Sequence, residues 1–320
     1  MTNMQLCRLY MDEFVRSSER KWMLDGEAYY RVDNPEIMNR KMYRYREEKT
    51  TGQIEKVLDR SKPNNKRAHG FMHLLIEDKT NYLLSKPYTL TCEESEEYLS
   101  MVQDTLGKNF QNRRLMRLGV SASNGGIAWL HPYIDEQGKF QTMIIPPEQG
   151  IPLWRDNDHE ELNGFIWFYN VQVIEGQEQK TVTKVEYWLS EAVAYYISDS
   201  EGEGWDLRLD SERYLDAVAD ENREFMEHFH IGNEAGNWGK VPFVPFKNND
   251  YELPDLKFVK SLIDGYDKAR SDVANFLDEV RSIVYALKGY GGHDLGEFMR
   301  DLNYFRAISL DEDGGAEAIT

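Results

Sequence analysis

Residues 256–279 read LKFVKSLIDGYDKARSDVANFLDE, and this stretch decides which fold the sequence predicts. Beginning at Val259, apolar side chains recur in steps of three and four residues, as an amphipathic helix requires. They are Leu262, Tyr266, Ala269, Val273, Phe276 and Val280. A helix over this stretch is about 36 Å long at 1.5 Å per residue. One such helix cannot bury its own apolar seam, so the sequence predicts that another surface covers it.

The region before this helix changes its hydrophobic pattern at Ser121. Aromatic and β-branched residues then predict six strands, which are residues 127–134, 139–145, 164–174, 181–189, 192–198 and 205–209. Short connectors favour antiparallel hairpins, because a parallel crossover needs a dozen or more residues. Pro242 and Pro245 keep the link to the long helix extended. The middle of the chain is therefore predicted to be an antiparallel, β-rich region.

Helices are predicted on both sides of this region. Residues 64–81, with Asn64 and Asn65 as caps, residues 93–108 and residues 111–118 form helices that brace the strands. After the long helix, a strand at 282–287, a helix at 294–305 and a strand at 307–310 predict a small α/β unit, and residues 311–317 carry no pattern of regular structure. The predicted class is α+β.

Charge limits the possible functions. The 320 residues include 38 basic and 56 acidic side chains, a net charge of −18. A free-standing DNA-binding protein is disfavoured, because non-specific affinity for DNA comes from cations that neutralise phosphates. Only residues 1–70 are mildly basic, with 15 basic and 11 acidic side chains.

Neither a membrane protein nor an exported one is indicated. No run approaches the roughly 18 apolar residues that span a bilayer, and Arg8, Asp12 and Glu13 stand where a signal peptide needs an apolar core. Cys7 and Cys92 have no metal-ligand spacing, which suits a reducing compartment such as the bacterial cytosol.

One group of residues suggests a metal site. His69, His73 and Glu77 are each four residues apart, so a helix would place them on one face as three possible zinc ligands. The Glu that directly follows the first His in zincins is missing here. No Gly-Lys-Ser/Thr loop for phosphate and no Gly-x-Ser-x-Gly nucleophile motif occurs. The sequence therefore predicts no catalysis, metal or cofactor, with a metal-dependent hydrolase as an alternative.

Several stretches in this order resemble one protein family. They are 63–67 (PNNKR), 74–79 (LLIEDK), 82–87 (YLLSKP), 239–242 (GKVP), 245–249 (PFKNN), 255–257 (DLK), 262–267 (LIDGYD), 283–288 (IVYALK) and 313–315 (DGG). Each stretch alone is a weak signal, but together they resemble the siphophage-type portal proteins of tailed bacteriophages. The resemblance runs from about residue 25 to the end.

The resemblance implies a domain organisation and a function. Residues 1–250 would form the wing, 251–281 a stem helix and 282–320 most of the clip. Portal proteins form a ring, typically of twelve subunits, at one capsid vertex, and double-stranded DNA passes through it non-specifically during packaging and ejection. The implied partners are the terminase large subunit, a head-completion protein, the scaffold and the major capsid protein. The implied location is the virion, after assembly in the bacterial host cytoplasm.

Residue roles follow from this resemblance as expectations. We expect a set of stem residues to contact other subunits or to line the channel: Lys257, Lys260, Asp264, Lys268 and Arg270. We expect Glu297, Arg300 and Asp301 of the clip helix to contact terminase or a head-completion protein. Family members continue into a second stem helix, a tunnel loop and a crown, and we expect these parts to be absent here. A β-rich head-tail adaptor is a further alternative.

Overall fold

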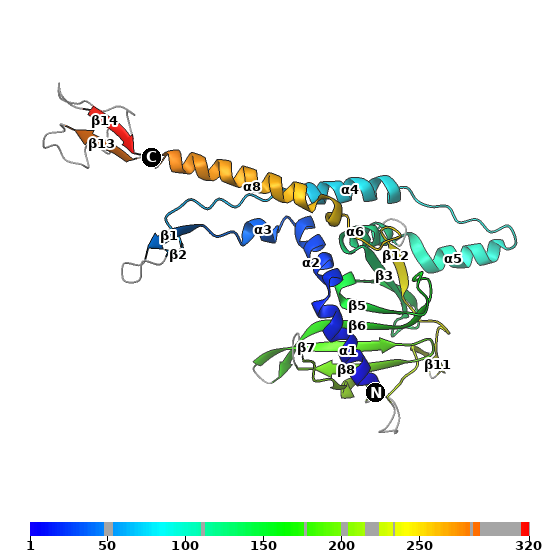
Figure 1. Cartoon of the computed structure of the whole chain (residues 1–320). Coiled ribbons are helices and arrows are strands. Elements are labelled where there is room, and N and C mark those ends of the chain that lie inside the picture. The colour runs from blue at the N-terminus through cyan, green and yellow to red at the C-terminus, as the bar shows by residue number, and fades with distance from the viewer. Residues whose placement is uncertain are drawn as a thin grey trace. The chain divides into compact units, whose positions relative to one another are not determined.

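The computed structural model describes residues 1–47, 54–109, 113–175, 178–199, 204–214, 224–232, 234–281, 284–288 and 315–319 (Figure 1). The chain forms two compact units. The first unit contains Met1–Pro35 and His69–Ile263, and the second contains Glu36–Ala68 and Asp264–Thr320. The boundary between them falls inside the long helix α8 (Leu256–Arg281), which confirms the helix predicted from the apolar seam.

The first unit contains several helices, and the junction between the first two has a clear local signal. They are α1 (Asn3–Arg16), α2 (Ser18–Tyr30), α4 (Phe71–Leu84), α5 (Glu96–Asn109), α6 (Leu115–Gly125) and the short α7 (Ser211–Tyr214). Ser17 both ends α1 and begins α2, because its N–H donates to the Phe14 carbonyl while its hydroxyl accepts the Arg20 N–H. A Ser at this position satisfies a backbone donor that the helix itself leaves unpaired.

The predicted antiparallel region is confirmed as two main sheets. One has the order β5-β6-β7-β8-β9 and the other β12-β3-β4. The strands of the first are β5 (Gly150–Trp154), β6 (Leu162–Glu175), β7 (Glu178–Trp188), β8 (Val193–Ser198) and β9 (Arg208–Leu209). Those of the second are β3 (Ile127–Ile134), β4 (Phe140–Ile145) and β12 (Val244–Lys247). The 3-10 turn η2 (Pro147–Gln149) connects β4 to β5, and β10 (Phe229–Ile231) pairs with β11 (Glu234–Gly236).

Two apolar clusters hold these sheets together. Helix α1 packs Cys7, Met11 and Phe14 against strands β6 to β8. The second cluster is aromatic and joins the two sheets, with Phe243 stacked on Phe165 at a centroid distance of 3.9 Å. Helix α1, which is not among the helices predicted to brace the strands, covers one face of the five-stranded sheet, and this packing of a helix on an antiparallel sheet is typical of the α+β class.

His131 lies within the aromatic cluster. It is buried on β3, stacks on Phe243 at 4.5 Å and lies 2.7 Å through Nδ1 from the Pro242 carbonyl oxygen. Burial lowers the pKa of His131 from its usual 6.5 to about 4, because the charged imidazolium loses its hydration. His131 is therefore neutral at physiological pH.

Helix α4 begins later than the sequence predicted. The predicted helix starts at Asn64, but α4 starts at Phe71 after Gly70. Asn64 and Asn65 do not cap it. The Asn64 side chain donates to the Arg40 carbonyl, and Asn65 bonds to Asn275 on α8. Long-range hydrogen bonds have displaced the local capping role that asparagine commonly takes.

The second unit contains a hairpin and the distal part of α8. The hairpin consists of β1 (Tyr43–Glu47) and β2 (Ile54–Leu58), and the short α3 (Pro35–Met38) precedes it. Beyond α8, β13 (Val284–Lys288) pairs antiparallel with β14 (Gly315–Ile319). The predicted strand at 282–287 is thus confirmed by β13, but the prediction that residues 311–317 carry no regular structure is wrong for 315–317, which belong to β14. The predicted helix at 294–305 and strand at 307–310 lie outside the described residues.

Among the residues that the structure describes, no helix is both long enough and apolar enough to cross a bilayer.

Candidate subunit interface on helix α8

The start of α8 is fixed by a carboxylate. Asp255 precedes the first residue of the helix and accepts hydrogen bonds from Lys79 Nζ at 2.7 Å and from Asn248 Nδ2 at 2.8 Å. Lys79 belongs to α4, so this ion pair joins the beginning of α8 to that helix. Charge-assisted hydrogen bonds of this kind are stronger than neutral ones.

Within the first unit, the proximal part of α8 buries a normal apolar face. Leu256 and Ile263 are buried in a cluster with Tyr29, Met72 and Ile76. Val259, the first residue of the predicted seam, is partly buried against the same cluster. These contacts come from α2 and α4, so the chain itself covers this side of the helix.

Two predicted contact residues lie beside aromatic rings of α2. Lys257 Nζ is 5.5 Å from the ring centroid of Trp22, and Lys260 Nζ is 5.2 Å from that of Tyr29. At these distances a cation is attracted by the ring quadrupole. Both side chains therefore have partners within their own chain, and their predicted role toward other subunits stays a prediction.

In the second unit, the buried face of α8 is polar apart from Ala274. Asp267, Ser271 and Asn275 are buried and recur every four residues. The segment before α4 crosses this face: the Asn65 N–H donates to Asn275 Oδ1 at 2.6 Å, and the Arg67 N–H donates to Ser271 Oγ at 3.0 Å. We call these three α8 residues the polar face.

Further polar contacts strengthen the same attachment. Asn65 Nδ2 donates to Asp278 Oδ2 at 2.7 Å, and Arg40 forms an ion pair with Asp272. A buried hydrogen bond typically stabilises by about 1 kcal/mol, and an unmade one costs about 1–3 kcal/mol. Hydrogen bonds and an ion pair therefore hold the crossing segment against α8.

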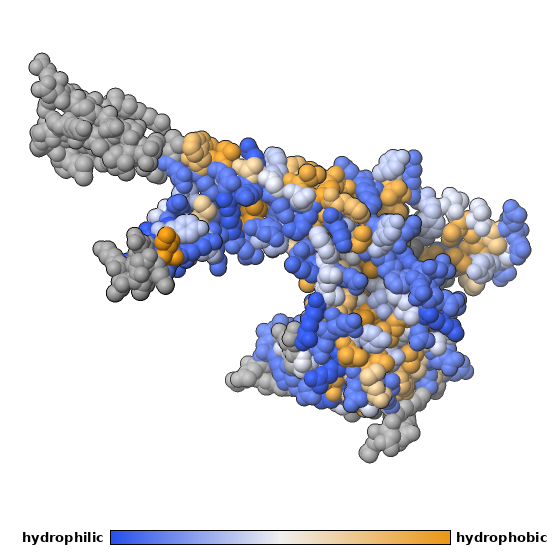
Figure 2. Space-filling view, viewed as in Figure 1, coloured by the Kyte–Doolittle hydropathy of each residue, from blue (hydrophilic) through white to orange (hydrophobic). Residues whose placement is uncertain are grey.

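The opposite side of α8 is apolar and exposed. We call it the apolar stripe, and it consists of Phe258, Leu262, Tyr266, Val273, Phe276 and Leu277. The exposed fractions of these side chains range from 44% to 73%. Hydrophobic residues are visible at the surface along α8 (Figure 2). The prediction that the seam is uncovered in a single copy is confirmed from Leu262 to Phe276.

This arrangement inverts the usual amphipathic pattern. A surface helix normally buries its apolar side and exposes its polar side. Full burial of a Leu or Phe side chain stabilises by about 1.5–3 kcal/mol. A single copy that leaves the apolar stripe exposed therefore lacks this stabilisation at each of its positions. Large contiguous apolar patches of this kind mark protein interfaces.

The remaining predicted residues are placed as follows. Lys268 and Arg270 are exposed on the distal part of α8, and Asp264 is partly buried. Nothing in the structure assigns these charges to a partner subunit. Glu297, Arg300 and Asp301 lie outside the described residues.

The proposed metal ligands do not converge. His69 precedes α4, so the three residues do not share one helical face. His73 packs against the Tyr30 ring at 4.7 Å, and Glu77 accepts the Tyr30 hydroxyl at 2.5 Å. Among the described residues, no group of three or more His, Cys, Asp or Glu side chains could hold a metal ion. The hydrolase alternative is not supported.

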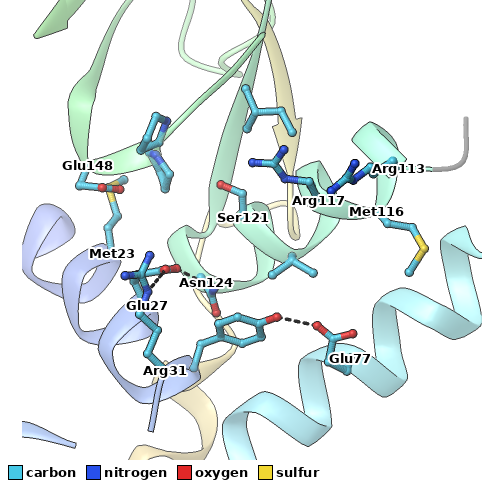
Figure 3. Close-up of a pocket in the computed structure, with 15 residues that line it drawn as sticks. Met23, Glu27, Arg31, Glu77, Arg113, Met116, Arg117, Ser121, Asn124 and Glu148 are labelled. Atoms are coloured by element: carbon cyan, nitrogen blue, oxygen red, sulfur yellow. Dashed lines mark hydrogen bonds and ion pairs between the residues drawn. The ribbon is translucent and has the colours of Figure 1, made fainter. Parts of the chain in front are cut away.

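Glu77 instead lines a pocket of about 560 Å³ between α2, α4 and α6 (Figure 3). Figure 3 shows Arg113 and Arg117 on one side of it, and Glu27 and Glu148 on the other. Glu27 pairs with the neighbouring Arg31 at 2.6 Å.

Comparison with known proteins gives these features a context. The family model "Phage portal protein, SPP1 Gp6-like" matches residues 16–320. The chain belongs to this portal protein family. It is 31% identical over 299 residues to the portal protein of Bacillus phage SPP1, across 93% of this chain and 55% of that protein. It is 28% identical over 312 residues to the portal protein of Clostridium phage phiCD119, across 94% of this chain and 62% of that protein.

Membership of the portal family confirms the resemblance seen in the sequence. The chain spans a little over half the length of the curated relatives that it matches. What sequence reasoning missed in this portal-family chain is the polar face and its partner Asn65. The only available signal was the recurrence of Asp267, Ser271 and Asn275 at intervals of four, which an exposed helix face would show equally.

Proposed function

We propose that this chain is a subunit of a phage portal ring, with residues 1–250 as the wing, 251–281 as the stem helix and 282–320 as the clip. Membership of the family supports this proposal. The observation that carries it is the apolar stripe, which is exposed on α8 while the polar face is buried. A ring of identical copies covers the stripe of every copy by the same contact.

In this role the ring is a conduit and not an enzyme. Double-stranded DNA passes through it during packaging and ejection, and a separate terminase supplies the energy. A net charge of −18 suits such a channel, because each cation that holds a phosphate adds attraction that must be broken as the DNA slides. The ring lies in the virion at one capsid vertex.

The partners in this proposal are other copies, typically twelve in a full-length ring, the terminase large subunit, a head-completion protein, the scaffold and the major capsid protein. Lys257, Lys260, Asp264, Lys268 and Arg270 are proposed for contacts between stems or for the channel wall. Glu297, Arg300 and Asp301 are proposed for contacts with terminase or the head-completion protein.

Assembly of the purified chain tests the proposal. Mass photometry and negative-stain images should show ring-shaped oligomers with a central hole at micromolar concentration. Leu262→Lys places a charge in the apolar stripe and should shift the population to monomers. Ser261→Lys adds the same charge to an exposed neighbouring position outside the stripe and should assemble normally. Monomers at every concentration for the unaltered chain would contradict the proposal.

A further inference from the structure

The β1–β2 hairpin has an exposed apolar side of its own. Its register places Tyr43 opposite Leu58 and Tyr45 opposite Lys56. Residues directly opposite in an antiparallel pair project from the same side, and the side chains alternate along each strand. Tyr43, Tyr45, Ile54, Lys56 and Leu58 therefore share one side, which we call the hairpin face. Its four apolar side chains are between 42% and 76% exposed.

Among the described residues, none of the apolar clusters includes the hairpin. Within the described residues, its sheet contains only β1 and β2. A two-stranded hairpin is marginally stable in water unless a further layer covers it. Lys56 Nζ lies 4.4 Å from the Tyr43 ring centroid, which adds a local cation–π contact but buries little area. The hairpin face therefore needs a covering surface.

The hairpin's own copy of α8 does not provide that surface. The segment that carries the hairpin contacts α8 through Arg40, Asn65 and Arg67, on or beside the polar face. Successive helix residues are rotated by about 100°, which places Val273 roughly 160° away from Ser271 around the helix axis. The apolar stripe thus faces away from the hairpin's attachment, and both surfaces stay exposed in one copy.

The two exposed surfaces match in length. The five-residue strands of the hairpin are about 17 Å long at 3.3–3.4 Å per residue. The distal part of the apolar stripe, from Tyr266 to Leu277, is about 18 Å long at 1.5 Å per residue. Both belong to the second unit. A face of two tyrosines and two aliphatic residues can cover a helix side of two aromatic and two aliphatic residues along its whole length.

Charge also matches between them. Lys56 is the cation of the hairpin face. Glu279 is exposed on α8 three residues after Phe276, so it borders the stripe on the helix surface. A hairpin laid on the stripe can bring Lys56 toward Glu279 at the edge of the apolar contact, where interfaces are usually polar.

We propose that the hairpin face of one copy docks on the distal apolar stripe of the next copy. The two surfaces are different, so the contact is head-to-tail, and each copy still offers a free hairpin and a free stripe to further copies. Repetition of such a contact generates a closed ring when the rotation between copies closes. This inference rests on the proposed ring and names the surfaces that join its members.

Cysteine cross-linking tests the contact directly. Tyr45→Cys and Phe276→Cys are combined in a chain that also carries Cys92→Ser, because Cys92 is the less buried of the two native cysteines. Under mild oxidation this variant should give a ladder of covalent multimers on a non-reducing gel, whereas each single-cysteine variant gives at most dimers.

The matched control replaces Tyr45→Cys by Arg44→Cys, which lies on the other side of β1, and should give at least fivefold less of the covalent multimers. A second variant that combines Ile54→Cys with Val273→Cys tests the same contact independently, in case the first variant does not fold.

Native mass spectrometry of the same samples separates the outcomes. Non-covalent oligomers without a ladder from either pair would overturn the hairpin contact and leave the proposed ring intact. Monomers without a ladder would overturn both. Efficient dimers from Tyr45→Cys alone would also overturn the inference, because they would mean that hairpins pair with each other. Lys56→Glu should slow formation of the ladder at least threefold, and addition of Glu279→Lys should restore it.

Discussion

The backbone N–H of Asn65 donates a 2.6 Å hydrogen bond to the side-chain Oδ1 of Asn275, 210 residues further along the chain. This contact fixes which side of α8 faces its own chain. Once the polar face is occupied by the segment around Asn65, the apolar stripe can only point outward. The exposed seam of this portal-family chain is therefore a consequence of a polar attachment on the opposite side.

Loss of the Asn275 side chain should open this attachment. Asn275→Ala removes the acceptor and leaves the Asn65 N–H unpaired, which costs about 1–3 kcal/mol. Hydrogen exchange followed by mass spectrometry should show the Asn65 amide exchanging roughly ten- to hundredfold faster. Ser261→Ala, on an exposed part of α8, is the control. Unchanged protection at Asn65 in Asn275→Ala would show that the bond does not hold the segment.

Two glycines in helices should respond in opposite ways to the same substitution. A Cβ at Gly26 would lie 2.0 Å from the Asn124 carbonyl oxygen, whereas a Cβ at Gly265 meets no atom within 4 Å. We expect Gly26→Ala to destabilise the fold by at least about 2 kcal/mol, because the backbone must shift. Gly265→Ala should stabilise by about 0.5–1 kcal/mol through helix propensity. Thermal melts compare the two, and equal effects would refute the close packing of α2 on α6.

Stability should fall between pH 6.5 and 4 because of His131. Its folded pKa of about 4 lies below the usual 6.5, so the unfolded state takes up a proton in this range and the folded state does not. Stability therefore increases as pH rises through this window and is lost as pH falls, by up to about 3 kcal/mol for this group. His131→Gln should flatten the dependence, measured as urea midpoints at pH 7 and pH 4.5. An identical pH dependence in the variant would exclude His131 as its cause.

DNA affinity should be weak and sensitive to salt. With a net charge of −18, the chain has few sites where cations outnumber carboxylates, and counterion release contributes little. Fluorescence anisotropy with a short labelled duplex should show no saturable binding at a physiological ionic strength of about 0.15 M. Some binding is expected at low salt through the basic segment 36–68, which holds ten basic and five acidic residues. Tight binding at physiological salt would argue against a conduit.

Much of the local structure was predictable from the sequence by itself. Steps of three and four apolar residues predicted α8, and alternation with short turns predicted the antiparallel strands around Trp129 and Phe165, because these patterns reflect the geometry of single elements. Asn64 and Asn65 misled the prediction of α4, because a capping residue looks the same whether it caps a nearby helix or bonds to a distant one.

Only the tertiary structure decided which side of α8 is used by its own chain. The sequence shows an apolar seam, and burial inside the same chain would be the ordinary outcome for it. The attachment of Asn65 and Arg67 to Asn275 and Ser271 reversed that outcome, because those backbone donors lose their water on folding and need polar acceptors. Such contacts join residues some two hundred positions apart, and no local pattern in the sequence encodes their pairing.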